Sequence, residues 1–153
     1  MIASATVPAP ALSIAPITDH DVAAIVALWQ ACGLTRPWND PTADIALARR
    51  GPNSAILVGR DGGAIVATAM VGHDGHRGWV YYVAVDPGHQ GKGLGRTIMA
   101  AVEDWLRETG VPKLQLLVRR ENAKASAFYQ SLGYEESTSI MLAKWLDGRE
   151  PTP

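Results

Sequence analysis

Apolar and polar positions along the chain follow two periods, one typical of strands and one typical of helices. Short apolar or alternating runs predict six strands, at residues 12–17, 55–59, 64–71, 79–85, 113–118 and 137–143. Apolar residues spaced three and four apart predict four helices, at residues 22–31, 41–50, 94–109 and 122–132. The pattern therefore predicts an α/β fold with the element order β-α-α-β-β-β-α-β-α-β.

Cap and turn residues support these boundaries. Thr18 or Asp19 can cap the first helix, and Gly33 ends it. Asp40 can cap the second helix, in which proline occupies the first turn. The sequence Asp61-Gly62-Gly63 between two apolar runs predicts a hairpin. The strand at 79–85, the helix after it and the strand at 113–118 form a β-α-β unit, so we expect these two strands to be parallel.

Length and composition are those of one globular domain. The chain has 153 residues, of which 47% are hydrophobic and 19% are charged. The Ala/Pro-rich residues 1–11 predict a flexible N-terminal tail, and residues 147–153 predict a C-terminal tail. No run reaches the roughly 18 apolar residues that span a bilayer, and so we expect no membrane partner.

The charges are balanced and scattered. The formal net charge is −1, which gives no basic surface for nucleic acid. Cys32 is the single cysteine, so it has no partner within the chain for a disulfide, and a reducing cytoplasm is the expected location. Its place in a helical pattern favours a small core residue over a nucleophile.

The most informative segment is the glycine-rich stretch at residues 85–96, between an apolar strand and an amphipathic helix. Gly91, Gly93 and Gly95 permit backbone angles closed to other residues and let a ligand approach the main chain. The N-terminus of the following helix adds positive potential. Lys92 and Arg96 add cations, which suits a pyrophosphate. The segment therefore predicts a site for a phosphorylated cofactor.

The glycine spacing separates this loop from two other phosphate loops. Gly93 follows Lys92 where a nucleoside triphosphate loop has a hydroxyl residue, and the dinucleotide spacing is also absent. The sequence from Gln90 to Gly95 instead resembles the Gln/Arg-x-x-Gly-x-Gly/Ala signature of the GNAT acetyltransferases, which bind acetyl-coenzyme A. A second stretch, from Asn122 through Tyr129 to Leu-Gly-Tyr, also resembles that family.

The resemblance covers most of the chain, and residues 33–41 and 72–78 are similar to a YpeA-like bacterial branch. It implies that residues 12–146 form a GNAT domain. That fold is an α/β sandwich with a mixed central sheet, splayed parallel strands at the cofactor site and helices on both faces.

By resemblance, the donor is acetyl-coenzyme A, and no metal is required. The residues implied to bind the cofactor are Val83, Val85, Gln90, Gly91, Lys92, Gly93, Leu94, Gly95, Arg96 and Asn122. The alternative for Asn122 is an N-cap of the last helix, and both roles are compatible. Tyr129 resembles the general acid that protonates the departing thiolate, with a packing aromatic as its alternative.

The general base is not apparent from the motifs. In a related branch, the protein-alanine acetyltransferases, a glutamate stands where this chain has Leu117. We expect the base among loop residues, with Asp74 and His76 as the preferred pair. The alternatives are His73, Asp40, Tyr81 acting through water, or an amine that is already neutral. A purely turn-forming role for 73–76 is an equal alternative, and a metal site is not expected because further ligands are lacking.

The acceptor is expected to be an amine. The family's acceptor loop lies between its first two helices, which places Arg36, Trp38 and Asp40 at the pocket, with Tyr81 beside them. The alternative is that Trp38 anchors this loop on the core. Nothing in the sequence distinguishes a monomer from a homodimer.

These features predict an N-acetyltransferase that acts by direct attack of the amine in a ternary complex. No Cys-His or Ser-His-Asp motif suggests a covalent intermediate. A non-catalytic module that senses acyl-coenzyme A is the alternative, and an acyltransferase with another acceptor atom is a third possibility.

Overall fold

The computed structural model describes residues 11–152, in two compact units. The first unit extends to Leu117, and the second begins at Val118. The predicted N-terminal tail lies outside the described residues except for Ala11, and Pro153 of the predicted C-terminal tail also lies outside. No helix in residues 11–152 is long and apolar enough to cross a membrane.

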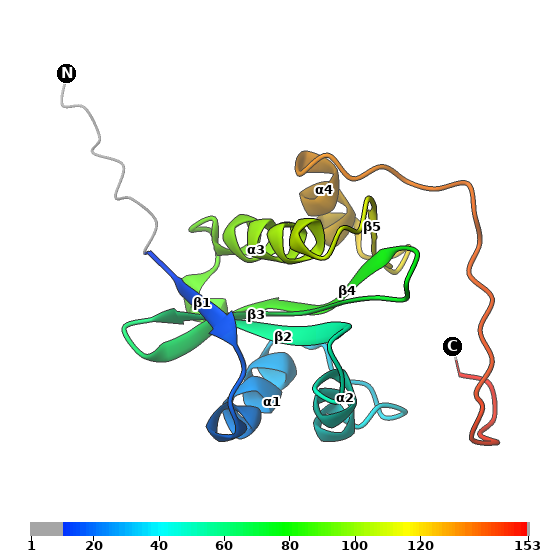
Figure 1. Ribbon diagram of the computed structural model, residues 1–153, viewed down its shortest axis with the longest axis horizontal. Helices are drawn as coiled ribbons and strands as arrows, with labels where there is room; N and C mark the ends of the chain where they lie inside the picture. The colour runs from blue at the N-terminus through cyan, green and yellow to red at the C-terminus, as the bar shows by residue number, and fades with distance from the viewer. Residues whose placement is uncertain (1–10, 153) are drawn as a thin grey trace. The chain divides into compact units, whose positions relative to one another are not determined.

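A five-stranded mixed sheet forms the centre of the first unit (Figure 1). Its strands are β1 (Ser13–Pro16), β2 (Ser54–Asp61), β3 (Ala64–His73), β4 (Gly78–Val85) and β5 (Leu114–Gln115). The strands lie in sequence order, and only β4 and β5 are parallel. The predicted strands at 12–17, 55–59, 64–71 and 79–85 and the parallel β-α-β unit are thereby confirmed.

Helices cover both faces of this sheet. Helix α3 (Leu94–Glu108) lies on one face, and α1 (Val22–Ala31) and α2 (Pro41–Ala48) lie on the other (Figure 1). The buried side of α3 consists of Leu94, Ile98, Met99, Val102 and Leu106. Trp105 has the helical spacing of this stripe, but it is only half-buried, and Leu106 takes the core position one residue on.

The cap of α2 forms as predicted, whereas Thr18 is the N-cap of a 3₁₀ turn that precedes α1, and α1 itself has no side-chain cap hydrogen bond. Asp40 accepts hydrogen bonds from the first-turn N–H groups of α2. A 3₁₀ turn, Asp19–Asp21, leads into α1, and there the Asp21 carboxylate accepts from Thr18 and from Arg60 of β2, at 2.6 Å. These donors lower the pKa of Asp21 to about 2, with the Arg60 hydrogen bond as the largest cause.

Two predicted strands differ in the structure. The predicted buried strand at 113–118 is paired only at Leu114 and Gln115, and Leu117 is 49% exposed. The predicted strand at 137–143 is wrong, because its residues are unpaired coil and its apolar side chains are exposed. An apolar run supplies side chains for a strand, but the strand forms only where a neighbour pairs with its backbone groups.

The second unit contains one helix, α4 (Ala123–Ser131), among its described residues. Asn122 caps it through a 3.1 Å hydrogen bond from the Ala125 N–H to its side-chain oxygen. Gly133, with φ of +94°, follows the helix end, and the Tyr134 N–H donates to the carbonyl of Tyr129. The helix predicted at 122–132 is confirmed.

Candidate active site

The predicted strand-loop-helix arrangement is present between β4 and α3. Gly91 and Gly93 have φ of +80° and +77°, in the left-handed region that favours glycine. Gly93 is the N-cap residue of α3. Gly95 differs from the expectation, because it is the second residue of α3 and its backbone is helical. Two of the three glycines are therefore required by backbone conformation.

The space above this loop is open. A Cβ added to Gly91 or Gly93 meets no described atom within 4 Å. The N-terminal N–H groups of α3 have no intrahelical acceptor, and Gly93 has no side chain to cap them. The first turn carries no acidic residue, and Lys92 and Arg96 are both exposed beside it. This arrangement can bind an anion mainly through backbone donors.

Hydrogen bonds within the loop hold its shape. The Asp86 carboxylate accepts from the Gly88 N–H at 3.0 Å and lies 2.9 Å from the ring of His89. The Gln90 side chain donates to the Val85 carbonyl at 3.3 Å, and the Cys32 thiol donates to the same oxygen. The side chain of Gln90 thus stabilises the loop, and the Val85 carbonyl already has two protein donors.

Next to the loop, one edge of β4 is unpaired. Parallel pairing with β5 includes only Gly78 with Leu114 and Trp79 with Gln115. From Val80 to Val85, β4 has no strand partner on that side in the described part of the chain. The strands therefore splay as expected. An extended ligand can add to such an edge through main-chain hydrogen bonds.

A backbone distortion lies within this free edge. Tyr82 has φ of +51° and is the one non-glycine residue at positive φ in the described chain. The β3–β4 register shifts between Thr68 and Met70, so that Tyr82 and Val83 oppose the single residue between them. This is a β-bulge in β4. Tyr82 was not predicted as a site residue from the sequence, because nothing in an apolar strand pattern indicates a left-handed tyrosine.

The second unit places two predicted residues on or next to α4. Asn122 is the N-cap, which confirms that alternative and leaves its nitrogen outside the cap bond. Tyr129 packs edge-on against Phe128 and Tyr134, with ring centroids 5.0 and 5.9 Å away. Burial raises the pKa of the Tyr129 hydroxyl, so the phenol stays protonated at neutral pH.

Comparison with known proteins decides the family. The pattern of the acetyltransferase (GNAT) family matches residues 22–134. The chain belongs to the GNAT family. An acetyltransferase of Yersinia enterocolitica is 39% identical over 128 residues, which make up 84% of this chain and 91% of that protein. The chain is thus an N-acetyltransferase with the GNAT fold.

Solved GNAT structures agree with this fold. The ribosomal-protein-S18-alanine N-acetyltransferase of Escherichia coli is 28% identical, with a TM-score of 0.71 over 84% of this chain and 80% of that one. The aminoglycoside N-acetyltransferase AAC(6')-Iy in complex with CoA is 17% identical, with a TM-score of 0.75 over 89% of this chain and 95% of that one. The second likeness concerns the fold alone.

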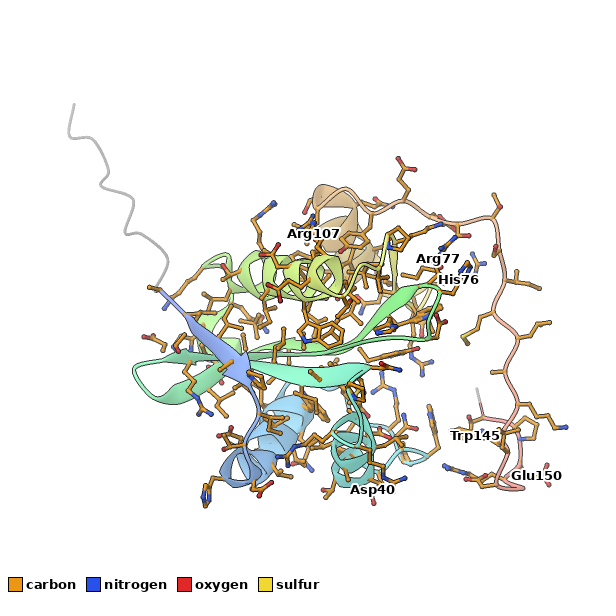
Figure 2. The ribbon with its side chains drawn as sticks, viewed as in Figure 1. Asp40, His76, Arg77, Arg107, Trp145 and Glu150 are labelled. Atoms are coloured by element: carbon orange, nitrogen blue, oxygen red, sulfur yellow. The ribbon has the colours of Figure 1, made fainter. Side chains whose placement is uncertain are left out.

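In this GNAT enzyme the two preferred base residues, Asp74 and His76, lie in the β3–β4 turn. Figure 2 labels His76 there. The Asp74 carboxylate accepts from the N–H groups of His76 and Arg77, at 2.9 and 2.7 Å, and from the Trp79 indole at 3.3 Å. These hydrogen bonds, that of Arg77 first, lower the pKa of Asp74. This geometry favours the turn-forming role for Asp74.

The β3–β4 turn and the glycine-rich loop lie at opposite ends of β4. The turn precedes Gly78, at the start of the strand, whereas the glycine-rich loop follows Val85 at its end. At about 3.3 Å per residue, the two ends of β4 lie roughly 20 Å apart. Tyr81 lies between them, 46% exposed and stacked on Trp79. Burial raises the pKa of the Tyr81 hydroxyl.

The predicted acceptor segment lies between α1 and α2. The Arg36 guanidinium donates to the carbonyls of Gly33 and Thr35, both at 2.9 Å. Asp40, at the start of α2, uses its carboxylate as the helix cap (Figure 2). Trp38 is half-buried. The charged side chains of this segment therefore have structural partners before any acceptor binds.

Proposed function

We propose that this enzyme transfers the acetyl group of acetyl-coenzyme A to a primary amine, on a small molecule or on a protein or peptide, by direct attack in a ternary complex. The observation that carries the proposal is the unpaired edge of β4, which ends at a loop of open, left-handed glycines and the N-terminus of α3. These features suit a ligand with an extended amide-containing arm and a pyrophosphate.

On the donor side, the pyrophosphate, the extended arm and the acetyl end of acetyl-coenzyme A each have a matching region. Backbone N–H groups from Gln90 to Arg96, including Leu94, bind the pyrophosphate, and Lys92 adds a mobile charge. Main-chain groups of Val83 and the Val85 N–H bind the arm and the acetyl end. Asn122 contributes its free side-chain nitrogen. The open Cβ positions at the loop support this fit.

In the reaction, the neutral amine nitrogen attacks the thioester carbonyl carbon, and the carbon–sulfur bond breaks. The departing thiolate takes the proton of the Tyr129 hydroxyl, and the nitrogen loses its extra proton to a base or water. The raised pKa of Tyr129 supports an acid that is protonated before each turnover. The phenol must then regain a proton from solvent.

For the base we retain the predicted pair, Asp74 and His76, with His76 as the stronger member. The Asp74 carboxylate has three donors and a lowered pKa, which makes it a weak proton acceptor. It can instead attract an acceptor ammonium. The acceptor pocket is assigned to Trp38, Arg36, Asp40 and Tyr81, the half-exposed tyrosine on β4.

The test is a screen of amines with two readouts, release of free coenzyme A and the mass of the product. Related GNAT structures are those of aminoglycoside and ribosomal-protein acetyltransferases, so the panel includes aminoglycosides, polyamines, lysine peptides and peptides with a free N-terminus. We expect a product heavier by one acetyl group on nitrogen. Acetyl-coenzyme A binding without thiol release on the whole panel would overturn the proposal and favour the sensor function.

A further inference from the structure

Tyr82 connects the bulge of β4 to three other elements, to two through its side chain and to one through its main-chain carbonyl. Its ring stacks on Trp29 of α1, with centroids 3.8 Å apart and an interplanar angle of 7°. Its hydroxyl donates to the Asp44 carboxylate of α2 at 2.7 Å. Its carbonyl accepts from the Thr68 hydroxyl of β3 at 3.1 Å. The ring, the hydroxyl and the main-chain carbonyl of Tyr82 therefore each have a partner in another element.

Two of the three residues that contact Tyr82 are buried and are hydrogen-bonded to each other. Trp29 and Thr68 are both 0% exposed, and the Trp29 indole N–H donates to the Thr68 hydroxyl at 2.9 Å. This hydroxyl thus accepts from Trp29 and donates to the carbonyl of Tyr82. Such a buried, fully satisfied network allows one arrangement of its members.

These contacts stabilise Tyr82 in a strained backbone conformation, with φ of +51°. A left-handed conformation costs a bulky residue about 1–2 kcal/mol, and it persists only where its surroundings impose it. In β4 the strained residue and Val83 oppose one residue of β3, so the bulge leaves backbone groups out of the β3 ladder. On the other side, pairing with β5 has already ended at Trp79. The backbone groups that the bulge leaves out of both strand ladders therefore lie where the acetyl end is proposed to bind.

We propose that Tyr82 and Asp44 are positioning residues for acetyl transfer, because their hydrogen bond holds the β4 bulge in the shape that binds the acetyl group. The inference rests on the proposed function above. Tyr82 acts through the main chain of its own strand, and Asp44 connects that strand to α2. The acceptor segment ends where α2 begins, so one helix serves both substrates.

A direct proton-transfer role fits Tyr82 less well. Burial is the largest cause that raises the pKa of its hydroxyl, and the Asp44 carboxylate adds to it. The phenol therefore keeps its proton across the neutral range and donates a hydrogen bond to the Asp44 carboxylate. A group held in this way supports geometry, and a displacement of about 1 Å in a reacting position can cost roughly 100-fold in rate.

The experiment compares Tyr82→Phe and Asp44→Ala with Asp44→Asn, which keeps an acceptor oxygen for the phenol. Ile45→Val is the matched control, since it removes a buried methyl group on the same helix and leaves the Tyr82–Asp44 bond intact. Three quantities are measured: kcat, the dissociation constants of acetyl-coenzyme A and free coenzyme A, and the unfolding free energy.

We expect kcat to fall about 10- to 100-fold in Tyr82→Phe and in Asp44→Ala, with free coenzyme A bound within about twofold of wild type. Any preference of wild type for acetyl-coenzyme A over coenzyme A should shrink in both variants. Asp44→Asn should recover part of the loss, and the double variant should lose no more than the worse single variant. Ile45→Val should keep wild-type kinetics.

Failure of this inference is distinct from failure of the proposed function. If wild type turns over and both variants keep kcat within twofold, the positioning role is refuted. If wild type binds acetyl-coenzyme A but acetylates no amine, the proposed function fails. In that case the preference for acetyl-coenzyme A over free coenzyme A tests the positioning role. The role is supported if wild type shows this preference and both variants lose it. The role is refuted if wild type shows no preference or if the variants keep it.

Discussion

Replacing Gly93 with alanine separates a backbone site for the pyrophosphate from a site made by charged side chains. Gly93 has φ of +77°, and a Cβ there meets no described atom within 4 Å. The free protein therefore suffers backbone strain without a clash, about 1–2 kcal/mol. A domain of ordinary stability, about 5–15 kcal/mol, remains almost fully folded after this loss.

The effect on binding should be larger than a stability change of this size can explain. The new methyl group projects into the open space in which the pyrophosphate is proposed to lie. Loss of one charge-assisted hydrogen bond costs about 1.5–3 kcal/mol, which raises the dissociation constant of acetyl-coenzyme A about 10- to 100-fold. Lys92→Ala removes one exposed charge, which contributes at most about 1 kcal/mol to binding. This variant should raise the dissociation constant of acetyl-coenzyme A about fivefold or less.

The assay is calorimetric titration with acetyl-coenzyme A, alongside urea unfolding of each variant. Gly110→Ala is the control, because Gly110 has φ of +81° and equally open surroundings but lies after the C-terminal end of α3. We expect Gly93→Ala and Gly110→Ala to lose similar stability and, of these two, only Gly93→Ala to lose affinity. Wild-type affinity in Gly93→Ala, or a greater loss in Lys92→Ala, would refute a backbone site at this loop.

Three further outcomes are expected. Tyr129→Phe should lower kcat about 10²- to 10⁴-fold with unchanged acetyl-coenzyme A affinity, measured by steady-state kinetics and titration; an unchanged kcat would make Tyr129 a packing residue. His76→Gln should flatten the rising limb of the plot of kcat/KM against pH, and Asp74→Asn should flatten it less. If both variants keep the wild-type rising limb, neither residue is the general base. Asp21→Asn should lower the unfolding free energy at neutral pH by about 1–3 kcal/mol, measured by urea unfolding, because the bond to Arg60 is lost. The lowered pKa of Asp21 gives stability that is present above about pH 4 and lost towards pH 2. Equal stability of variant and wild type at pH 7 would contradict the role of this bond.

The sequence by itself determined the elements whose signals are local. Helix periodicity, the caps at Asp40 and Asn122 and the hairpin at residues 61–63 depend on neighbours a few positions away, and all are present in the structure. The same holds for the glycine-rich loop between β4 and α3, since its spacing is itself the motif. Family membership followed from these segments, and comparison confirmed it.

Tertiary structure decided what depends on partners distant in sequence. The apolar runs at 113–118 and 137–143 do not encode whether a neighbouring strand pairs with them, and little or no strand forms there. Asp74 was predicted from its residue type, but its turn hydrogen bonds decide how weak a base it is. The left-handed Tyr82 depends on Trp29 and Asp44, residues 53 and 38 positions away in the sequence, whose ring and carboxylate only the folded chain brings to it.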